Sequence, residues 1–122
     1  VIPGRAIVAA GGKHMELAKH GGKWVVELNE GPKVARQRPS VEVLFQSVAK
    51  LAGAQSVAVI MTGMGGDGAE GMLALKNAGA QTIAQDEASC VVFGMPKEAI
   101  RMGGANHVVS LTKIPEMILK LL

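Results

Sequence analysis

An aspartate inside a glycine-dense turn is the residue of this sequence with the clearest capacity for chemistry. Residues 57–61 form a short apolar run, and residues 63–68 then read Gly-Met-Gly-Gly-Asp-Gly, with Asp67 as the charged residue. A helix-like pattern begins directly afterwards. Because α/β proteins place ligands and catalytic groups beyond the carboxyl ends of their strands, this pattern predicts a functional site at Asp67.

Two interpretations of the turn involve no catalysis. Residues 63–68 match the G-x-G-x-x-G pattern of a Rossmann-like dinucleotide-binding module, and Asp86 lies near the expected ribose-binding position. Asp67 weakens this interpretation, because a carboxylate opposes the pyrophosphate that a helix N-terminus attracts. Alternatively, Asp67 and Glu70 have the spacing of a capping box, which would stabilise the following helix by about 1 kcal/mol. A cap does not account for the four glycines among residues 63–68.

A third interpretation makes Asp67 the acid of a Ser-His-Asp triad. Such an acid fixes the tautomer of the histidine and stabilises the imidazolium that forms during attack. The surrounding glycines would let another segment approach closely and would leave backbone N–H groups free for an oxyanion. The spacing of these residues alone does not decide among the three interpretations.

The rest of the sequence predicts the elements that must position this turn. Strand and helix patterns alternate from residue 40 onward, which predicts an α/β fold with a parallel sheet. The expected elements are a strand at 5–9, a hairpin of 15–18 and 24–28, a helix from its Ser40 cap to Gly53, a strand at 57–61, a helix ending at 77–79, a strand at 81–85, a helix at 95–101, a strand at 108–109 and a helix at 115–122.

Composition narrows the classes of function. Aromatic residues make up 2% of the 122 residues, which disfavours stacking on nucleic-acid bases. A single cysteine, Cys90, permits no internal disulfide and no metal framework, and no activating neighbour surrounds it in the sequence, so it is predicted to be a small buried hydrophobe. The apolar runs are too short for membrane insertion, and a cytoplasmic protein is expected.

Five segments occur in an order that is more specific than any one motif. They are Gly11–Met15, Arg38–Val41 with Leu44–Phe45, Thr62–Gly68, Ala84–Glu87, and Val92–Pro96 with Ala99–Ile100. Together, from about Pro3 to the end, they resemble the catalytic domain of the CheB-type chemotaxis protein-glutamate methylesterases. One departure is Ala10, where the family usually has proline.

This resemblance implies a doubly wound α/β fold with a mostly parallel sheet, helices on both faces and an antiparallel hairpin. Residues 1–122 would be the C-terminal part of a single methylesterase catalytic domain whose front part is missing, and the start at Val1 without methionine suggests a cut inside a longer protein. Asp67 would be the triad acid, and the backbone N–H of Met64 would help to bind the oxyanion. Gly65, Gly66 and His14 are candidates for lining the substrate cleft, with a packing role as the alternative for His14.

The implied reaction is hydrolysis of glutamate methyl esters on methyl-accepting chemoreceptors, with receptor glutamine deamidation in relatives, and it needs no cofactor or metal. An upstream receiver domain is the further expected partner. The family's Gly-Ser-Thr-Gly-Gly-like nucleophile turn and Gln-His-Met-like base segment do not occur here. The chain alone is therefore expected to be inactive and, with an uncovered sheet edge, to self-associate. A non-catalytic receptor-binding fragment remains an alternative.

Overall fold

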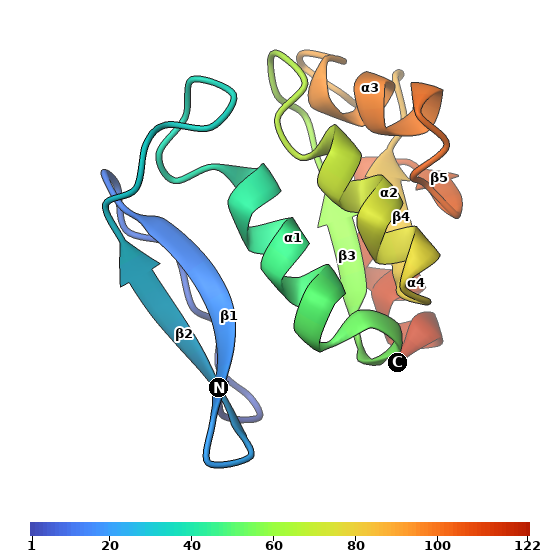
Figure 1. Ribbon diagram of the computed structural model, residues 1–122. Coiled ribbons are helices and arrows are strands. Elements are labelled where there is room, and N and C mark those ends of the chain that lie inside the picture. The colour runs from blue at the N-terminus through green and yellow to red at the C-terminus, as the bar shows by residue number, and fades with distance from the viewer.

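The computed structural model describes residues 1–122 as an α/β fold with a separate hairpin (Figure 1). The elements are β1 (His14–His20), β2 (Lys23–Asn29), α1 (Val41–Leu51), β3 (Val57–Ile60), α2 (Ala69–Asn77), β4 (Gln81–Gln85), α3 (Met95–Arg101), β5 (His107–Val109) and α4 (Ile114–Leu121), with single 3₁₀ turns at Gly53–Gln55 and Leu111–Lys113. None of the helices is long and apolar enough to cross a membrane.

The main sheet has three parallel strands in the order β3-β4-β5, which confirms the predicted α/β class. Val57 pairs with Gln81 at the start of β3, and Ile83 pairs with His107 at the start of β5. In Figure 1, α1 and α2 lie in front of this sheet and α4 lies behind it. The strands are parallel because a helix connects each strand to the next. Such a connection brings the chain back to the end of the sheet where the previous strand began.

The hairpin of β1 and β2 is also confirmed, and it lies beside α1 (Figure 1). Gly21 and Gly22 form its turn with φ angles of +57° and +76°, the left-handed values that a two-residue turn of this kind requires. The hairpin is joined to α1 by a hydrogen bond of 2.8 Å from the backbone N–H of Leu17 to Ser47 Oγ.

The core is aliphatic and lies between the sheet and α2. Its fully buried side chains include Ile60, Met72 and Leu75, and Phe45 of α1 packs against the same cluster. The backbones of α1 and α2 come unusually close at one point, since a Cβ built on Gly71 would lie 2.6 Å from Phe45 Cβ. Two helices can approach this closely only where a side chain is missing.

The prediction of a strand at Arg5–Ala9 is wrong. These residues belong to no strand, and Arg5 to Val8 are exposed. A strand is stable only when its backbone groups pair with a neighbour, and no strand of this chain lies beside the segment. The predicted boundaries of the other elements agree with the structure to within one or two residues.

Candidate functional site

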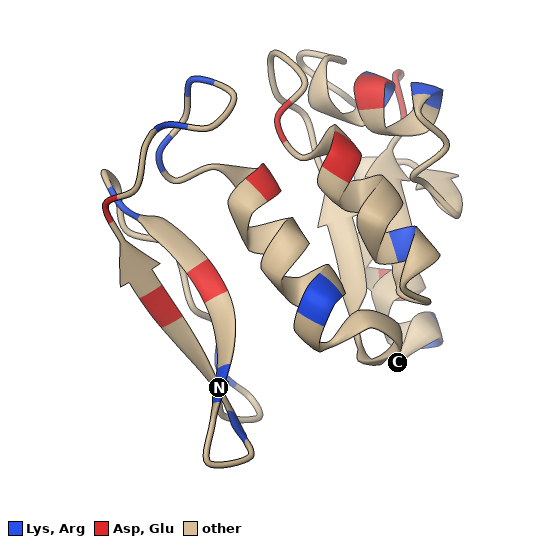
Figure 2. Ribbon diagram, viewed as in Figure 1, with Lys and Arg blue, Asp and Glu red and all other residues tan.

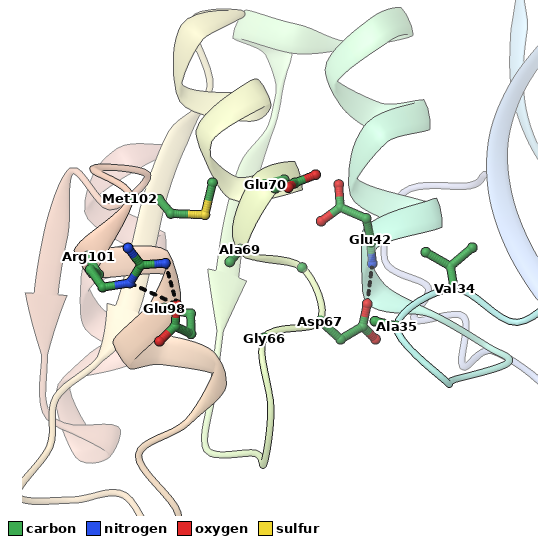
Figure 3. Close-up of a pocket in the computed structure, with 11 residues that line it drawn as sticks. Val34, Ala35, Glu42, Gly66, Asp67, Ala69, Glu70, Glu98, Arg101 and Met102 are labelled. Carbon is green, nitrogen blue, oxygen red and sulfur yellow. Dashed lines mark hydrogen bonds and ion pairs between the residues drawn. The ribbon is translucent and has the colours of Figure 1, made fainter.

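Asp67 is buried, with 6% of its surface exposed, and its carboxylate accepts three hydrogen bonds from the start of α1. Oδ1 accepts from Ser40 Oγ at 2.7 Å and from the backbone N–H of Glu42 at 3.0 Å. Oδ2 accepts from the backbone N–H of Val41 at 2.9 Å. Figure 3 shows the Asp67 side chain between the turn that carries it and the first residues of α1. Asp67 therefore caps a helix that begins 26 residues before it.

The structure contradicts the alternative interpretation of Asp67 and Glu70 as a capping box. The N-cap of α2 is Gly68, and no side chain bonds to the first turn of that helix from this position. Gly68 has a φ of +90°, which turns the chain so that Asp67 points toward α1 instead of its own helix. Ser40 does hold the predicted N-cap position of α1, but its hydroxyl makes no capping bond to its own helix.

Glu42 makes the reciprocal contact, from α1 to the start of α2. Its Oε1 accepts a hydrogen bond of 2.8 Å from the backbone N–H of Gly71, in the first turn of α2, and Oε2 accepts from Gln46 Nε2 at 2.6 Å. The two helix N-termini are thus capped by carboxylates from each other's segments. This exchange fixes the glycine turn relative to α1, because the turn enters α2 directly.

The glycine turn itself presents backbone donors to its surroundings. The N–H groups of residues 64–68 donate no hydrogen bond within the chain. Met64 is 85% exposed as a residue, and Gly65 and Gly66 beside it are exposed as well. Unpaired N–H groups beside a buried carboxylate are suited to bind a developing negative charge on an oxygen.

The base of the turn is held by residues 92–95. The carbonyl oxygen of Gly63 accepts hydrogen bonds from the backbone N–H groups of Gly94 at 3.1 Å and Met95 at 2.9 Å. A Cβ built on Gly94 would lie 2.6 Å from Gly63 O and 3.0 Å from the nitrogen of Gly65. Gly94 is therefore a residue on which the shape of the turn depends, and its role was missed from the sequence although it stands in the Phe-Gly-Met-Pro segment.

A second support, also missed from the sequence, comes from the fully buried Gln85 at the end of β4. Its Oε1 accepts from the backbone N–H of Thr62 at 2.8 Å, and its Nε2 donates to the carbonyl of Ser89 at 2.8 Å. Thr62 Oγ1 in turn accepts from the backbone N–H of Val92 at 2.9 Å. Paired in this way, the amide orients the chain just before the glycine turn.

Two adjoining cavities open around Asp67. One, of about 380 Å³, lies between α1, the turn and α3, and the other, of about 370 Å³, lies between the turn and the loop before α1. Glu42, Glu98 and Arg101 line the first (Figure 3), and Met64, Gly65 and Gly66 line the second. No group of three or more His, Cys, Asp or Glu side chains is arranged to hold a metal ion.

His14 contacts Ser40, which separates it from Asp67, and it lines neither of these cavities. Its ring is buried, with 2% of the residue exposed. Nδ1 accepts a hydrogen bond of 3.1 Å from the backbone N–H of Ser40, and Nε2 lies 2.8 Å from the carbonyl oxygen of Pro32. Because a carbonyl only accepts, these partners assign the proton to Nε2. A cleft-lining role of His14 stays a prediction.

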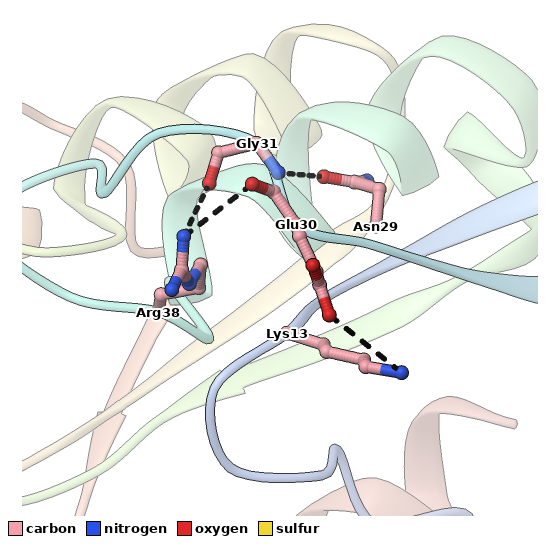
Figure 4. Close-up of polar contacts among 5 residues, drawn as sticks. All are labelled: Lys13, Asn29, Glu30, Gly31 and Arg38. Atoms are coloured by element: carbon pink, nitrogen blue, oxygen red, sulfur yellow. Dashed lines mark hydrogen bonds and ion pairs between the residues drawn. The ribbon is translucent and has the colours of Figure 1, made fainter.

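The loop between β2 and α1 is held by contacts to its own backbone (Figure 4). Arg38 Nη1 donates to the carbonyl oxygens of Glu30 at 3.3 Å and Gly31 at 3.2 Å, while Asn29 Oδ1 accepts from the N–H of Gly31 at 3.0 Å. Lys13 Nζ lies 4.0 Å from a carboxylate oxygen of Glu30. These contacts set the path of the loop that delivers Ser40 to Asp67.

A parallel α/β sheet with a buried acid and unpaired N–H groups at a strand end defines an α/β protein with a candidate site for stabilising negative charge on an oxygen. Residues 1–118 match the family model described as CheB methylesterase, and the chain belongs to this family.

Individual relatives agree with this assignment. A protein-glutamate methylesterase/protein-glutamine glutaminase from Salmonella typhimurium is 60% identical over 119 residues, and one from Escherichia coli is 58% identical. These matches cover 98% of this chain and 34% of each relative, so the chain spans about a third of their length. The crystal structure of the Thermotoga maritima CheB methylesterase catalytic domain has a TM-score of 0.90 at 38% identity, covering 93% of this chain and 60% of that one.

Proposed function

We propose that this chain contributes the acid and the oxyanion-binding turn to the active site of a protein-glutamate methylesterase. The observation that carries the proposal is the carboxylate of Asp67, held by three hydrogen bonds beside unpaired backbone N–H groups. Oδ2 accepts one of these bonds and keeps a second acceptor position for the N–H of a histidine. Residues 1–122 would form the C-terminal part of the catalytic domain.

The reaction would be hydrolysis of a glutamate methyl ester to a glutamate carboxylate and methanol. A serine oxygen attacks the ester carbonyl, while a histidine takes the serine proton and passes it to the departing methoxide. Asp67 orients that histidine, and the N–H of Met64 donates to the oxyanion. Water then hydrolyses the acyl-enzyme. The serine and the histidine would come from residues outside this chain, and hydrolysis of a receptor glutamine by the same steps would release ammonia.

The substrates would be methyl-accepting chemoreceptors, as the family resemblance implies, and the names of the relatives, which specify protein-bound glutamate and glutamine, fit such substrates. A cytoplasmic location and a receiver domain joined to the catalytic domain fit the same function. Basic residues, blue in Figure 2, lie on the loop before α1. Arg36, which is exposed on this loop, is a candidate for contact with acidic receptor side chains.

The test compares the full-length protein that contains this chain with its Asp67→Asn variant and with residues 1–122 alone. Methanol release from methylated receptor membranes should fall about 10³- to 10⁴-fold in the variant, because the histidine loses its orienting charge. The 122-residue chain should release none. A variant that retains full activity, or an isolated chain that matches the full-length protein, would overturn the proposal.

Two further functions remain to be tested in the same preparation. A receptor-binding fragment without catalysis would bind methylated receptor membranes yet leave their methyl esters intact. A dinucleotide-binding module would bind NAD in a calorimetric titration. The second is disfavoured by Asp67, because it places a carboxylate in the turn that would have to cradle the pyrophosphate.

A further inference from the structure

We infer that Ser40 is a positioning residue for Asp67, and that His14 holds Ser40 in place from the other side. The inference rests on the proposed function, because it concerns how the triad acid is oriented. A series of hydrogen bonds joins these residues. It runs from the carbonyl of Pro32 through the ring of His14 to the backbone N–H of Ser40, and from the hydroxyl of Ser40 to Oδ1 of Asp67.

Every side chain in this series is buried. Ser40 and His14 are each 2% exposed, and Asp67 is 6% exposed. The contact from Ser40 Oγ to Asp67 Oδ1, at 2.7 Å, is as short as expected for a hydroxyl that donates to a charged carboxylate. Such a bond is stronger than one between neutral groups, and water does not compete for it at a buried position.

Helix capping does not account for the direction of the Ser40 hydroxyl. A serine at an N-cap normally accepts a hydrogen bond from a backbone N–H of the first turn. Here the N–H groups of Val41 and Glu42 bond to Asp67 instead, and the hydroxyl of Ser40 donates to the same carboxylate. The serine therefore stabilises the carboxylate, and the carboxylate stabilises the helix.

The hydroxyl decides which carboxylate oxygen remains available. Each carboxylate oxygen offers two acceptor positions. Both positions of Oδ1 are taken, by Ser40 and by Glu42, whereas Oδ2 bonds only to the N–H of Val41. Without the hydroxyl, Oδ1 would also have an open position, and the carboxylate could rotate to offer either oxygen. Ser40 thus restricts Asp67 to one orientation toward a histidine.

His14 fixes the backbone from which Ser40 acts. Its Nδ1 accepts the N–H of Ser40, and its Nε2 is fixed by the carbonyl of Pro32 in the loop before α1. The ring joins β1 to this loop, so the position of the hairpin sets the position of the serine. His14 acts through Ser40 and does not touch Asp67.

The experiment uses the full-length protein with two alanine variants, one at the N-cap of α1 and one within that helix. Ser40→Ala removes the hydroxyl that reaches Asp67. Ser47→Ala is the matched control, because Ser47 Oγ accepts from the N–H of Leu17 at 2.8 Å and donates to the carbonyl of Leu44 at 2.7 Å without touching Asp67. Methanol release from methylated receptor membranes gives kcat and KM, and thermal unfolding gives the stability of each variant.

The expected result is a kcat about tenfold lower for Ser40→Ala with KM unchanged, the loss of one hydrogen bond to a charged group. Ser47→Ala should lose comparable stability and keep its kcat. Ser40→Thr, which keeps the hydroxyl, should recover most of the kcat. If Ser40→Ala does not fold, Ser40→Cys, which preserves the size of the side chain with a weaker donor, should show the same fall in kcat.

Equal kcat values for the Ser40 and Ser47 variants would overturn the inference, as would a fall confined to KM. This outcome is separable from failure of the proposed function. Asp67→Asn without loss of activity would reject the role of the acid itself, whereas an inactive Asp67→Asn beside a fully active Ser40→Ala would reject only the positioning role of the serine.

Discussion

Glu42 and Asp67 cap each other's helices. The Asp67 carboxylate accepts the N–H groups of Val41 and Glu42 at the start of α1, and the Glu42 carboxylate accepts the N–H of Gly71 in the first turn of α2. Each helix start therefore depends on a side chain from the other helix segment. The aspartate proposed as the catalytic acid is at the same time part of the packing of the two helices.

Removal of the Glu42 side chain should destabilise the fold. Glu42→Ala deprives the N–H of Gly71 of its acceptor, so the free energy of unfolding should fall by about 1 kcal/mol. Glu70→Ala is the control, because Glu70 is exposed in the first turn of α2, and its removal should change stability by about 0.5 kcal/mol or less. Urea unfolding followed by circular dichroism measures both. Equal losses would contradict the exchange of caps.

Gly71→Ala tests the close approach of the two helices. Alanine normally stabilises a helix interior by about 0.5–1 kcal/mol relative to glycine. At Gly71 the new Cβ would lie 2.6 Å from Phe45 Cβ, so the helices must separate and stability should fall by about 1–3 kcal/mol. A fall in stability would therefore support the close approach of the two helices, and a rise would contradict it. Gly11→Ala, with no atom within 4 Å of the new Cβ, is the control.

Gly94→Ala should reduce activity through the shape of the glycine turn. The new Cβ would lie 2.6 Å from Gly63 O and 3.2 Å from Met64 Cα, so it would displace the peptide that carries the Met64 N–H proposed to bind the oxyanion. Loss of one such donor costs about 10²- to 10³-fold in kcat. Methanol release by the full-length protein measures the effect, and Gly11→Ala again serves as control. An unchanged kcat would show that the turn tolerates the shift.

Cys90 should react slowly with alkylating reagents. The residue is only partly buried, less than the sequence predicted, yet this burial raises the pKa of its thiol; a hydrogen bond with Thr62 lowers it and the charges of Asp86 and Glu87 raise it. The unfolded chain therefore releases this proton first, so stability decreases as the pH rises from the unfolded pKa through the folded one. The rate of iodoacetamide labelling against pH should have its midpoint above that of a free cysteine. A midpoint below it would contradict the assignment.

Residues 1–122 expressed alone should self-associate. β3 is an edge strand of the sheet, and apolar side chains such as Val8 and Val91 are each 90% exposed. Unpaired edges and exposed apolar surface favour contact between copies. Size-exclusion chromatography at several protein concentrations should show elution volumes that decrease as concentration rises. A monomer at every concentration would contradict this expectation.

The fold was largely predictable because its signals are local. The apolar run at 57–61 predicted β3, and Gly21-Gly22 predicted the hairpin turn. The strand expected at Arg5–Ala9 failed for a non-local reason, since strand formation needs a partner that the pattern does not reveal. The length and apolar pattern of this segment could not distinguish a strand that has a neighbouring strand from an extended segment that has none.

The site was predictable in its position and not in its contacts. The glycine turn identified Asp67, but its three partners lie about 26 residues away, beyond any spacing rule for helix caps. A signal was present in Gly68, the N-cap of α2, and Gly71 in its first turn, because both face α1. Small residues at such positions indicate two close backbones, and that approach brings the carboxylate to the neighbouring helix.

The hydrogen bonds around Asp67 come entirely from residues of this chain. A buried negative charge is costly unless its surroundings are already polarised toward it, and here the N-terminal dipole of α1 supplies that polarisation. The carboxylate is therefore preorganised: its solvation shell is made of backbone and side-chain groups that need not rearrange when a histidine arrives. In the proposed active site, the surroundings of the acid would thus be electrostatically complete before the serine and the histidine are added.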